Sequence, residues 1–180
     1  EAAFRSLLSG ANTGKVVLRV RQAGMTAVCT SRVSHLLTGG TGGLGLLTAR
    51  WLAQHGASSV VLASRSGMLP MGGSGSAGAE CEQLLASDAR VLTECCDAAE
   101  ASEARRLVSA ARLALPAAVG GVWHAAGVLA DGTLAQQDAA SLRRVYGPKA
   151  HGAVMLQHAC ATSVLHACAL FSSVAALLGN

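Results

Sequence analysis

The sequence predicts an α/β fold in which a doubly wound parallel sheet carries helices on both faces. Strand-like and helix-like segments alternate from about residue 34 to residue 173, which is the pattern of a parallel sheet with helical crossovers. A glycine-rich turn joins the first of these strands to the first helix. Hydrophobic residues make up 51% of the 180 residues but aromatic ones only 3%, so the core is built from small side chains that suit close helix–sheet packing.

Short, continuously apolar runs predict five buried strands, at residues 35–38, 59–63, 89–94, 121–124 and 164–171. Apolar residues at helical spacing predict helices at 44–55, 79–86, 102–113 and about 138–160. Pro148 is expected to break or kink the last helix, and residues 68–78 form a Gly/Ser-rich loop. Five strands with helical connections fit a Rossmann-like sheet of order 3-2-1-4-5, in which ligands bind at the carboxyl ends of the strands.

The chain divides into two unequal parts. A turn at residues 10–14 and a β-rich run at 14–20 differ from the regular alternation that follows. We expect residues 1–30 to be the closing edge of a structure that lies upstream, and residues 31–180 to form the ligand-binding unit.

Composition argues against several classes of function. A net charge of +4 without a run of basic residues does not predict nucleic-acid binding. Six cysteines without a C-x-x-C pair indicate reduced thiols. The near-repeat His158-Ala-Cys160 and His166-Ala-Cys168 falls on two predicted elements and does not predict a metal site. No apolar run is long enough to span a bilayer, so we expect a cytoplasmic protein that binds no membrane; organelle targeting stays open, since a fragment can lack its leader.

The glycine-rich turn predicts a phosphate-binding site. Its glycines follow the pattern T-G-x-x-x-G-x-G, which differs from the G-x-G-x-x-G of the standard dinucleotide fingerprint. Glycine allows the backbone to approach a ligand closely, and the helix that follows directs its free N–H groups and positive dipole end to the same place. The predicted cradle comprises Thr38, Gly39, Gly40, Thr41, Gly42, Gly43, Leu44 and Gly45.

The end of the second strand favours NADPH over NADH. An NAD site places an acidic residue there, whereas this sequence has Ser64, Arg65 and Ser66. The Arg65 guanidinium pairs well with a 2′-phosphate, and we expect Ser64 or Ser66 to assist it. Asp97, after the third strand, is predicted either to accept a hydrogen bond from the adenine or to cap a helix. The small residues Ala125, Ala126 and Gly127, after the fourth strand, leave room for the cofactor ribose.

Together these motifs closely resemble the ketoreductase domain of modular polyketide synthases, a branch of the short-chain dehydrogenase/reductases that includes the ketoreductase of animal fatty-acid synthase. The resemblance covers about residues 14–180. It implies that residues 1–30 end a structural subdomain and that residues 31–180 are an NADPH-binding catalytic subdomain. The motifs that carry it, in order, are TGGTGGLG at 38–45, SRSG at 64–67, CD at 96–97, HAAGVL at 124–129, PKAHGA at 148–153 and LFSS at 170–173.

The resemblance implies reduction of a β-ketoacyl thioester, carried on an acyl carrier protein, by hydride from NADPH, with other polyketide synthase domains in the same polypeptide. Ser173 matches the serine that hydrogen-bonds the substrate carbonyl, and Lys149 the lysine that lowers the pKa of a tyrosine acid. By the spacing of the family, that tyrosine and an asparagine are expected at positions after Asn180. Tyr146, the single tyrosine, lies on the wrong element and is not assigned the role. We therefore expect a fragment, incomplete at its C-terminus, that does not reduce ketones alone.

Some alternatives stay open at this stage. Asp131, two residues after the leucine of HAAGVL, matches a marker of the group that makes D-configured alcohols, but it also suits a turn before Gly132. The chain can alternatively be a non-reducing ketoreductase-like domain with a structural or epimerising role. A nucleotide-sugar or methyl-transfer enzyme with a similar turn is disfavoured by Arg65, because a free ribose calls for an acid there.

Overall fold

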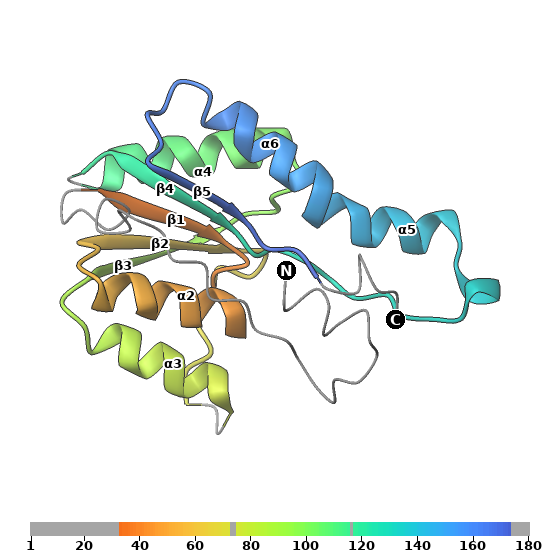
Figure 1. The fold of residues 1–180 in the computed structure, drawn as a ribbon, viewed down its shortest axis with the longest axis horizontal. Coiled ribbons are helices and arrows are strands. Elements are labelled where there is room, and N and C mark those ends of the chain that lie inside the picture. Colours follow the sequence, from red (N-terminus) through yellow and green to blue (C-terminus); the bar gives the residue numbers. More distant parts are fainter. Residues whose placement is uncertain (1–32, 73–74, 116, 174–180) are drawn as a thin grey trace, which may run out of the picture.

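The computed structural model describes residues 33–72, 75–115 and 117–173, and the expectations for residues 1–30 lie outside these ranges. Its centre is a parallel sheet in the order β3-β2-β1-β4-β5, which confirms the predicted topology (Figure 1). The strands are β1 (Ser34–Thr38), β2 (Ser59–Ser64), β3 (Arg90–Cys95), β4 (Val119–His124) and β5 (Ala167–Leu170).

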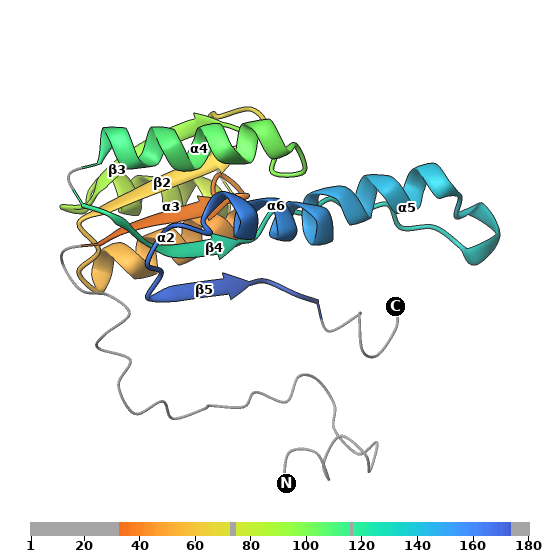
Figure 2. The ribbon, with the colours of Figure 1, turned by 90° about the horizontal axis from the view of Figure 1, so that it is seen from above.

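Helices cover both faces of this sheet. The helices are α2 (Gly43–Gln54), α3 (Ser76–Leu85), α4 (Ala101–Ala114), α5 (Ala139–Tyr146) and α6 (Gly152–Ala159), with a short 3₁₀ helix η2 (Leu134–Gln136). Helices α4 and α6 lie on one face, and α2 and α3 on the other (Figures 1 and 2). Successive β1 residues supply the two cores, since Leu36 packs on the α4/α6 side and Leu37 on the α2/α3 side.

The switch point of the sheet lies at the end of β1. Thr38 pairs with Ala63 of β2 on one side and with His124 of β4 on the other. Because all the strands are parallel, the residues after β1, β2, β3 and β4 emerge at the same edge of the sheet. At the switch point, the loops that follow neighbouring strands run to opposite faces of the sheet. They leave a crevice between them, and ligands bind there in this fold.

The long helix predicted at 138–160 is instead α5 and α6 joined by a π-helix, η3 (Gly147–His151). The cause is Pro148, whose nitrogen has no hydrogen to donate and whose ring crowds the preceding turn. The helix does not end at this proline but widens into a π-turn, in which the N–H of Gly152 donates to the carbonyl of Gly147. Helix α5 consequently extends beyond the sheet (Figures 1 and 2).

Other boundaries shift by a few residues. Helix α3 begins at Ser76, three residues earlier than predicted, after Gly75 as its N-cap. Strand β5 covers only Ala167–Leu170 of the predicted 164–171. Apolar runs continue past the backbone hydrogen bonds that define a strand, so the sequence pattern overestimates the length of β5.

Candidate functional site

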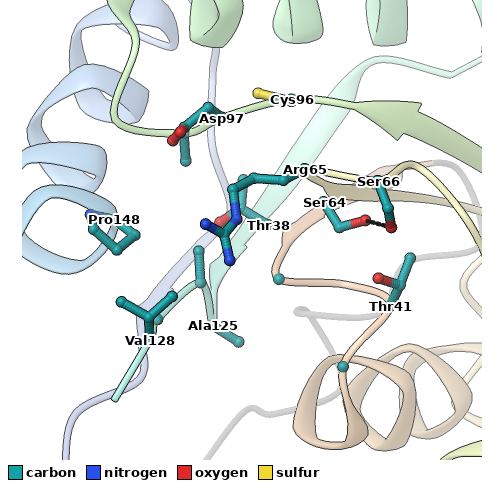
Figure 3. Close-up of a pocket in the computed structure, with 15 residues that line it drawn as sticks. Thr38, Thr41, Ser64, Arg65, Ser66, Cys96, Asp97, Ala125, Val128 and Pro148 are labelled. Carbon is teal, nitrogen blue, oxygen red and sulfur yellow. Dashed lines mark hydrogen bonds between the residues drawn. The ribbon is translucent and has the colours of Figure 1, made fainter. Parts of the chain in front are cut away.

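A pocket of about 650 Å³ opens at the carboxyl edge of the sheet (Figure 3). It is lined by residues that follow β1, β2, β3 and β4 and by one residue of η3. These are Thr38, Gly39, Thr41, Gly42, Ser64, Arg65, Ser66, Cys96, Asp97, Ala98, Ala125, Ala126, Gly127, Val128 and Pro148. The volume is within the range of small-molecule sites. Segments up to 110 residues apart in the chain therefore converge at the predicted switch point.

Three glycines of the cradle are required by the packing of the turn itself. A Cβ at Gly40 would lie 2.8 Å from the carbonyl oxygen of Leu37 and from the Cα of Leu62. Gly39 has a φ of +69°, and a Cβ there would lie 2.6 Å from the backbone of Ala125. A Cβ at Gly45 would overlap the carbonyl oxygen of Gly39. At Gly43, by contrast, a Cβ would meet nothing within 4 Å, so the protein itself does not require glycine there. Gly43 is the first residue of α2.

The N-terminus of α2 has no side chain of its own to cap it. Its N-cap residue is Gly42, and within the described part of the chain the helix start has no side-chain cap hydrogen bond. Such a helix end presents unsatisfied N–H groups and a positive partial charge, which together suit an anion. Of the predicted cradle, Thr38, Gly39, Thr41 and Gly42 line the pocket, whereas Gly40, Gly43, Leu44 and Gly45 do not.

The turn after β2 holds Arg65 at the pocket. The Ser64 hydroxyl accepts a hydrogen bond from the Gly67 N–H (3.1 Å) and lies 3.4 Å from the Ser66 hydroxyl (Figure 3). The Cys95 thiol donates to the carbonyl of Arg65 (3.0 Å), which ties the turn to β3. The Arg65 guanidinium extends into the pocket, and within residues 33–72, 75–115 and 117–173 it forms neither a hydrogen bond nor an ion pair.

Asp97 forms the wall of the pocket after β3. Its Oδ1 accepts a hydrogen bond from the Ala99 N–H (3.0 Å), and its own N–H donates to Glu103 (2.7 Å). The N-cap of α4 is Glu100, so the helix-cap role predicted as one alternative for Asp97 is wrong. Neighbouring Cys96 is buried, which raises the pKa of its thiol to about 11 and keeps it protonated and unreactive near neutral pH.

Lys149 reaches the pocket edge from η3. A Cβ built on Gly127 would lie 3.0 Å from Lys149 Cε, so the lysine side chain crosses directly over that glycine. The backbone carbonyl of Lys149 accepts a hydrogen bond from His124 Nε2 (2.8 Å). The other ring nitrogen of His124 lies 2.6 Å from the hydroxyl of Thr38. The Thr38 hydroxyl is thus engaged inside the protein.

The remaining predicted residues lie outside the pocket lining. Ser173 is exposed, three residues beyond β5, and its strand is tied to β4 by a hydrogen bond from the Phe171 N–H to the His124 carbonyl (3.0 Å). Asp131 is exposed in the irregular stretch before η2. Tyr146, on α5, is 65% exposed. The structure brings Lys149 to the pocket edge but does not enclose Ser173, Asp131 or Tyr146 in it.

Four lining residues were not assigned to the site from the sequence, namely Cys96, Ala98, Val128 and Pro148. Pro148 is the instructive case, because its place in the wall follows from the π-helix. The signal in the sequence that could have identified Pro148 is its position next to Lys149.

Within the described residues, no helix is both long and apolar enough to cross a membrane.

A parallel sheet with an open pocket at its switch point, bordered by a glycine-rich turn and a helix N-terminus, is typical of dinucleotide-binding α/β domains. The KR domain family model matches residues 33–180. The chain belongs to this family of ketoreductase domains, an oxidoreductase family of polyketide synthases whose fold typically binds a nicotinamide cofactor.

The relatives are much longer proteins. The chain is 39% identical over 188 residues to a mycocerosic acid synthase-like polyketide synthase of Mycobacterium tuberculosis, covering 99% of this chain and 9% of the relative. It is 36% identical over 155 residues to a 6-methylsalicylic acid synthase of Arthrobotrys oligospora, covering 83% of this chain and 9% of that protein. The chain thus spans under a tenth of these curated relatives.

Solved structures agree with the family. An N-terminal ketoreductase from the macrolactin assembly line superposes with a TM-score of 0.75 at 26% identity, covering 91% of this chain and 32% of that one. A structure of A-type ketoreductases from a modular polyketide synthase superposes with a TM-score of 0.72 at 31% identity, covering 90% and 34%. The predicted recognition and fold class are therefore confirmed.

Proposed function

We propose that this ketoreductase domain binds NADPH and takes part in reducing a β-ketoacyl thioester, carried on an acyl carrier protein, to the β-hydroxyacyl form. The observation that carries the cofactor assignment is the guanidinium of Arg65, which extends into the pocket without a protein partner within the described residues. A cation left unpaired at the end of β2 suits the 2′-phosphate that distinguishes NADPH from NADH.

The rest of the pocket offers a matching group for each part of the cofactor. The uncapped start of α2 suits the pyrophosphate. Asp97 keeps Oδ2 without a hydrogen bond inside the described chain, and this oxygen is the acceptor available to an adenine amino group. The small residues Ala125, Ala126 and Gly127 suit the sugar and lead to Lys149.

The chemistry assigned to this chain is the handling of charge at the substrate oxygen. Bound NADPH supplies the hydride. The Ser173 hydroxyl would donate a hydrogen bond to the carbonyl oxygen as negative charge develops there, which is the logic of an oxyanion-stabilising donor. The Lys149 ammonium would lower the pKa of a nearby acid by charge attraction and so favour proton transfer to the alkoxide. We further propose that Asp131 marks a D-configured product.

Calorimetric titration with NADPH and NADH tests the cofactor assignment. Hydrogen bonds to charged groups contribute about 1.5–3 kcal/mol, and each 1.4 kcal/mol is about tenfold in affinity. We expect Arg65→Ala to weaken NADPH binding about 10- to 100-fold and to leave NADH binding within about twofold. Arg105→Ala is the matched control, because Arg105 is an exposed arginine on α4 outside the pocket lining. Equal affinity of the wild-type chain for both dinucleotides would refute the assignment of Arg65.

A further inference from the structure

We propose that His124 is a positioning residue that couples the phosphate cradle to the turn carrying Lys149. This inference rests on the proposed function, because the position of the Lys149 amine matters only if Lys149 takes part in the reaction. His124 is the last residue of β4 and is 3% exposed. It connects Thr38, at the end of β1, with Lys149 in η3, two residues that lie 111 positions apart in the sequence.

The partners of the imidazole define the tautomer of its neutral form. Nε2 faces the carbonyl oxygen of Lys149 at 2.8 Å, and a carbonyl only accepts, so Nε2 carries the hydrogen. In the neutral ring Nδ1 is then an acceptor, and the Thr38 hydroxyl donates to it at 2.6 Å. Hydrogen bonds run in one direction, from Thr38 through His124 to the Lys149 carbonyl. In this state the imidazole has no nitrogen left over for a ligand.

Close packing holds the imidazole against η3. A Cβ at Gly152 would lie 3.1 Å from His124 Cε1, closer than nearly all real contacts, so glycine is what lets the start of α6 approach the ring. Gly127, three residues after His124, receives the Lys149 side chain in the same way. The exit of β4 therefore contacts both the main chain and the side chain of the lysine.

The turn has little buried surface of its own. Neither α5 nor η3 contributes a buried residue to the described structure, and α5 extends beyond the sheet (Figures 1 and 2). A helix segment without a buried face takes little stability from packing. The hydrogen bond from buried His124 to the Lys149 carbonyl thus fixes the position of η3 relative to the pocket. The hydrogen bond between Thr38 and His124 in turn fixes the orientation of the imidazole.

Lysine NMR provides a readout that loss of stability alone does not change. The chain has two lysines, Lys15 and Lys149, so a sample labelled with ¹³C at the lysine ε-carbon gives two assignable signals, with Lys15→Arg as the assignment variant. We would measure the Lys149 signal with and without saturating NADPH in Thr38→Val and Thr38→Ser. The first removes the hydroxyl and keeps the shape, whereas the second keeps the hydroxyl.

Ser59→Ala is the matched control for a lost buried hydrogen bond. The Ser59 and Ser34 hydroxyls lie 2.8 Å apart and are buried at the opposite, amino-terminal end of the strands. We expect Thr38→Val to reduce the NADPH-induced displacement of the Lys149 signal at least twofold at saturation. Thr38→Ser and Ser59→Ala should keep at least four-fifths of it. His124→Gln, which keeps a donor and an acceptor, should retain more of the displacement than His124→Leu.

The outcomes separate the two proposals. A Lys149 displacement that survives unchanged in both Thr38→Val and His124→Leu overturns the coupling and leaves the NADPH assignment intact. A wild-type chain whose Lys149 signal does not respond to NADPH refutes the proposed role of the lysine and the coupling with it. Should the two substitutions prevent folding, long-range ¹H–¹⁵N spectra of wild-type His124 decide, since a hydrogen on Nδ1 instead of Nε2 contradicts the proposed direction of the bonds.

Discussion

His35 lies at the centre of the sheet and makes stability depend on pH. Its side chain is fully buried, and its Nδ1 accepts a hydrogen bond from Trp123 Nε1 (3.2 Å). Its Nε2 has no hydrogen-bond partner among the residues that the structure describes. Burial lowers the pKa of His35 from 6.5 to about 4, because a charged imidazole would lose its hydration in this environment. The folded state therefore holds His35 in the neutral form.

The direction of the effect follows from the lowered pKa. Between pH 6.5 and 4 the unfolded chain takes up a proton at His35 that the folded chain does not, so stability is complete above pH 6.5 and falls as the pH drops. The lowered pKa corresponds to about 3 kcal/mol in total, at about 1.36 kcal/mol per unit. About 2 kcal/mol of this is lost by pH 5, before most carboxylates titrate.

Urea unfolding followed by circular dichroism between pH 7.5 and pH 5 measures this loss. We expect the wild-type free energy of unfolding to fall by about 2 kcal/mol more than that of His35→Leu over this interval. His158→Gln, which removes an exposed histidine on α6, should follow the wild type. Equal pH dependence of the wild type and His35→Leu would refute the reasoning. If the leucine variant does not fold, an NMR titration of His35 that gives a pKa above 6 refutes it equally.

Two further predictions use matched pairs of positions. Gly39→Ala should destabilise the fold by about 1–3 kcal/mol in urea unfolding, because φ is +69° and Ala125 leaves no space. Gly43→Ala should leave stability unchanged in the same assay, because a Cβ there would meet nothing within 4 Å. Equal loss of stability in Gly39→Ala and Gly43→Ala would contradict this distinction. Leu107→Ala should cost about 2–5 kcal/mol, since the side chain is fully buried; Leu113→Ala, 89% exposed on the same helix, should cost under 0.5 kcal/mol in the same assay.

The sequence alone predicted the architecture well because the relevant signals are local. Apolar runs and helical periodicity alternate clearly enough to predict every strand and the order of the sheet. The position of Arg65 directly after the second strand was sufficient to place it at the carboxyl edge, where the structure has it. Long-range geometry was not needed for these conclusions, since parallel strands with helical crossovers leave few topologies.

Other features depend on contacts between distant parts of the chain. Pro148 predicted a break in the helix, but whether the helix would end, kink or widen into a π-turn depends on what the turn packs against. The helix-cap alternative for Asp97 failed for a similar reason, since a helix start is set by backbone geometry that shifts by a few residues.

The sequence by itself determined the fold class, the cradle and the charge at the end of β2, because strand pattern, glycine spacing and residue type are readable along the chain. Only the tertiary structure distinguished Gly39, Gly40 and Gly45, where backbone atoms leave no space for a Cβ, from Gly43, where a Cβ would meet nothing within 4 Å. It alone joined His124 to both Thr38 and Lys149. These partners are 86 and 25 residues from His124 in the sequence, so no periodic pattern of residues predicts them. The contacts depend on how whole strands and helices pack against one another.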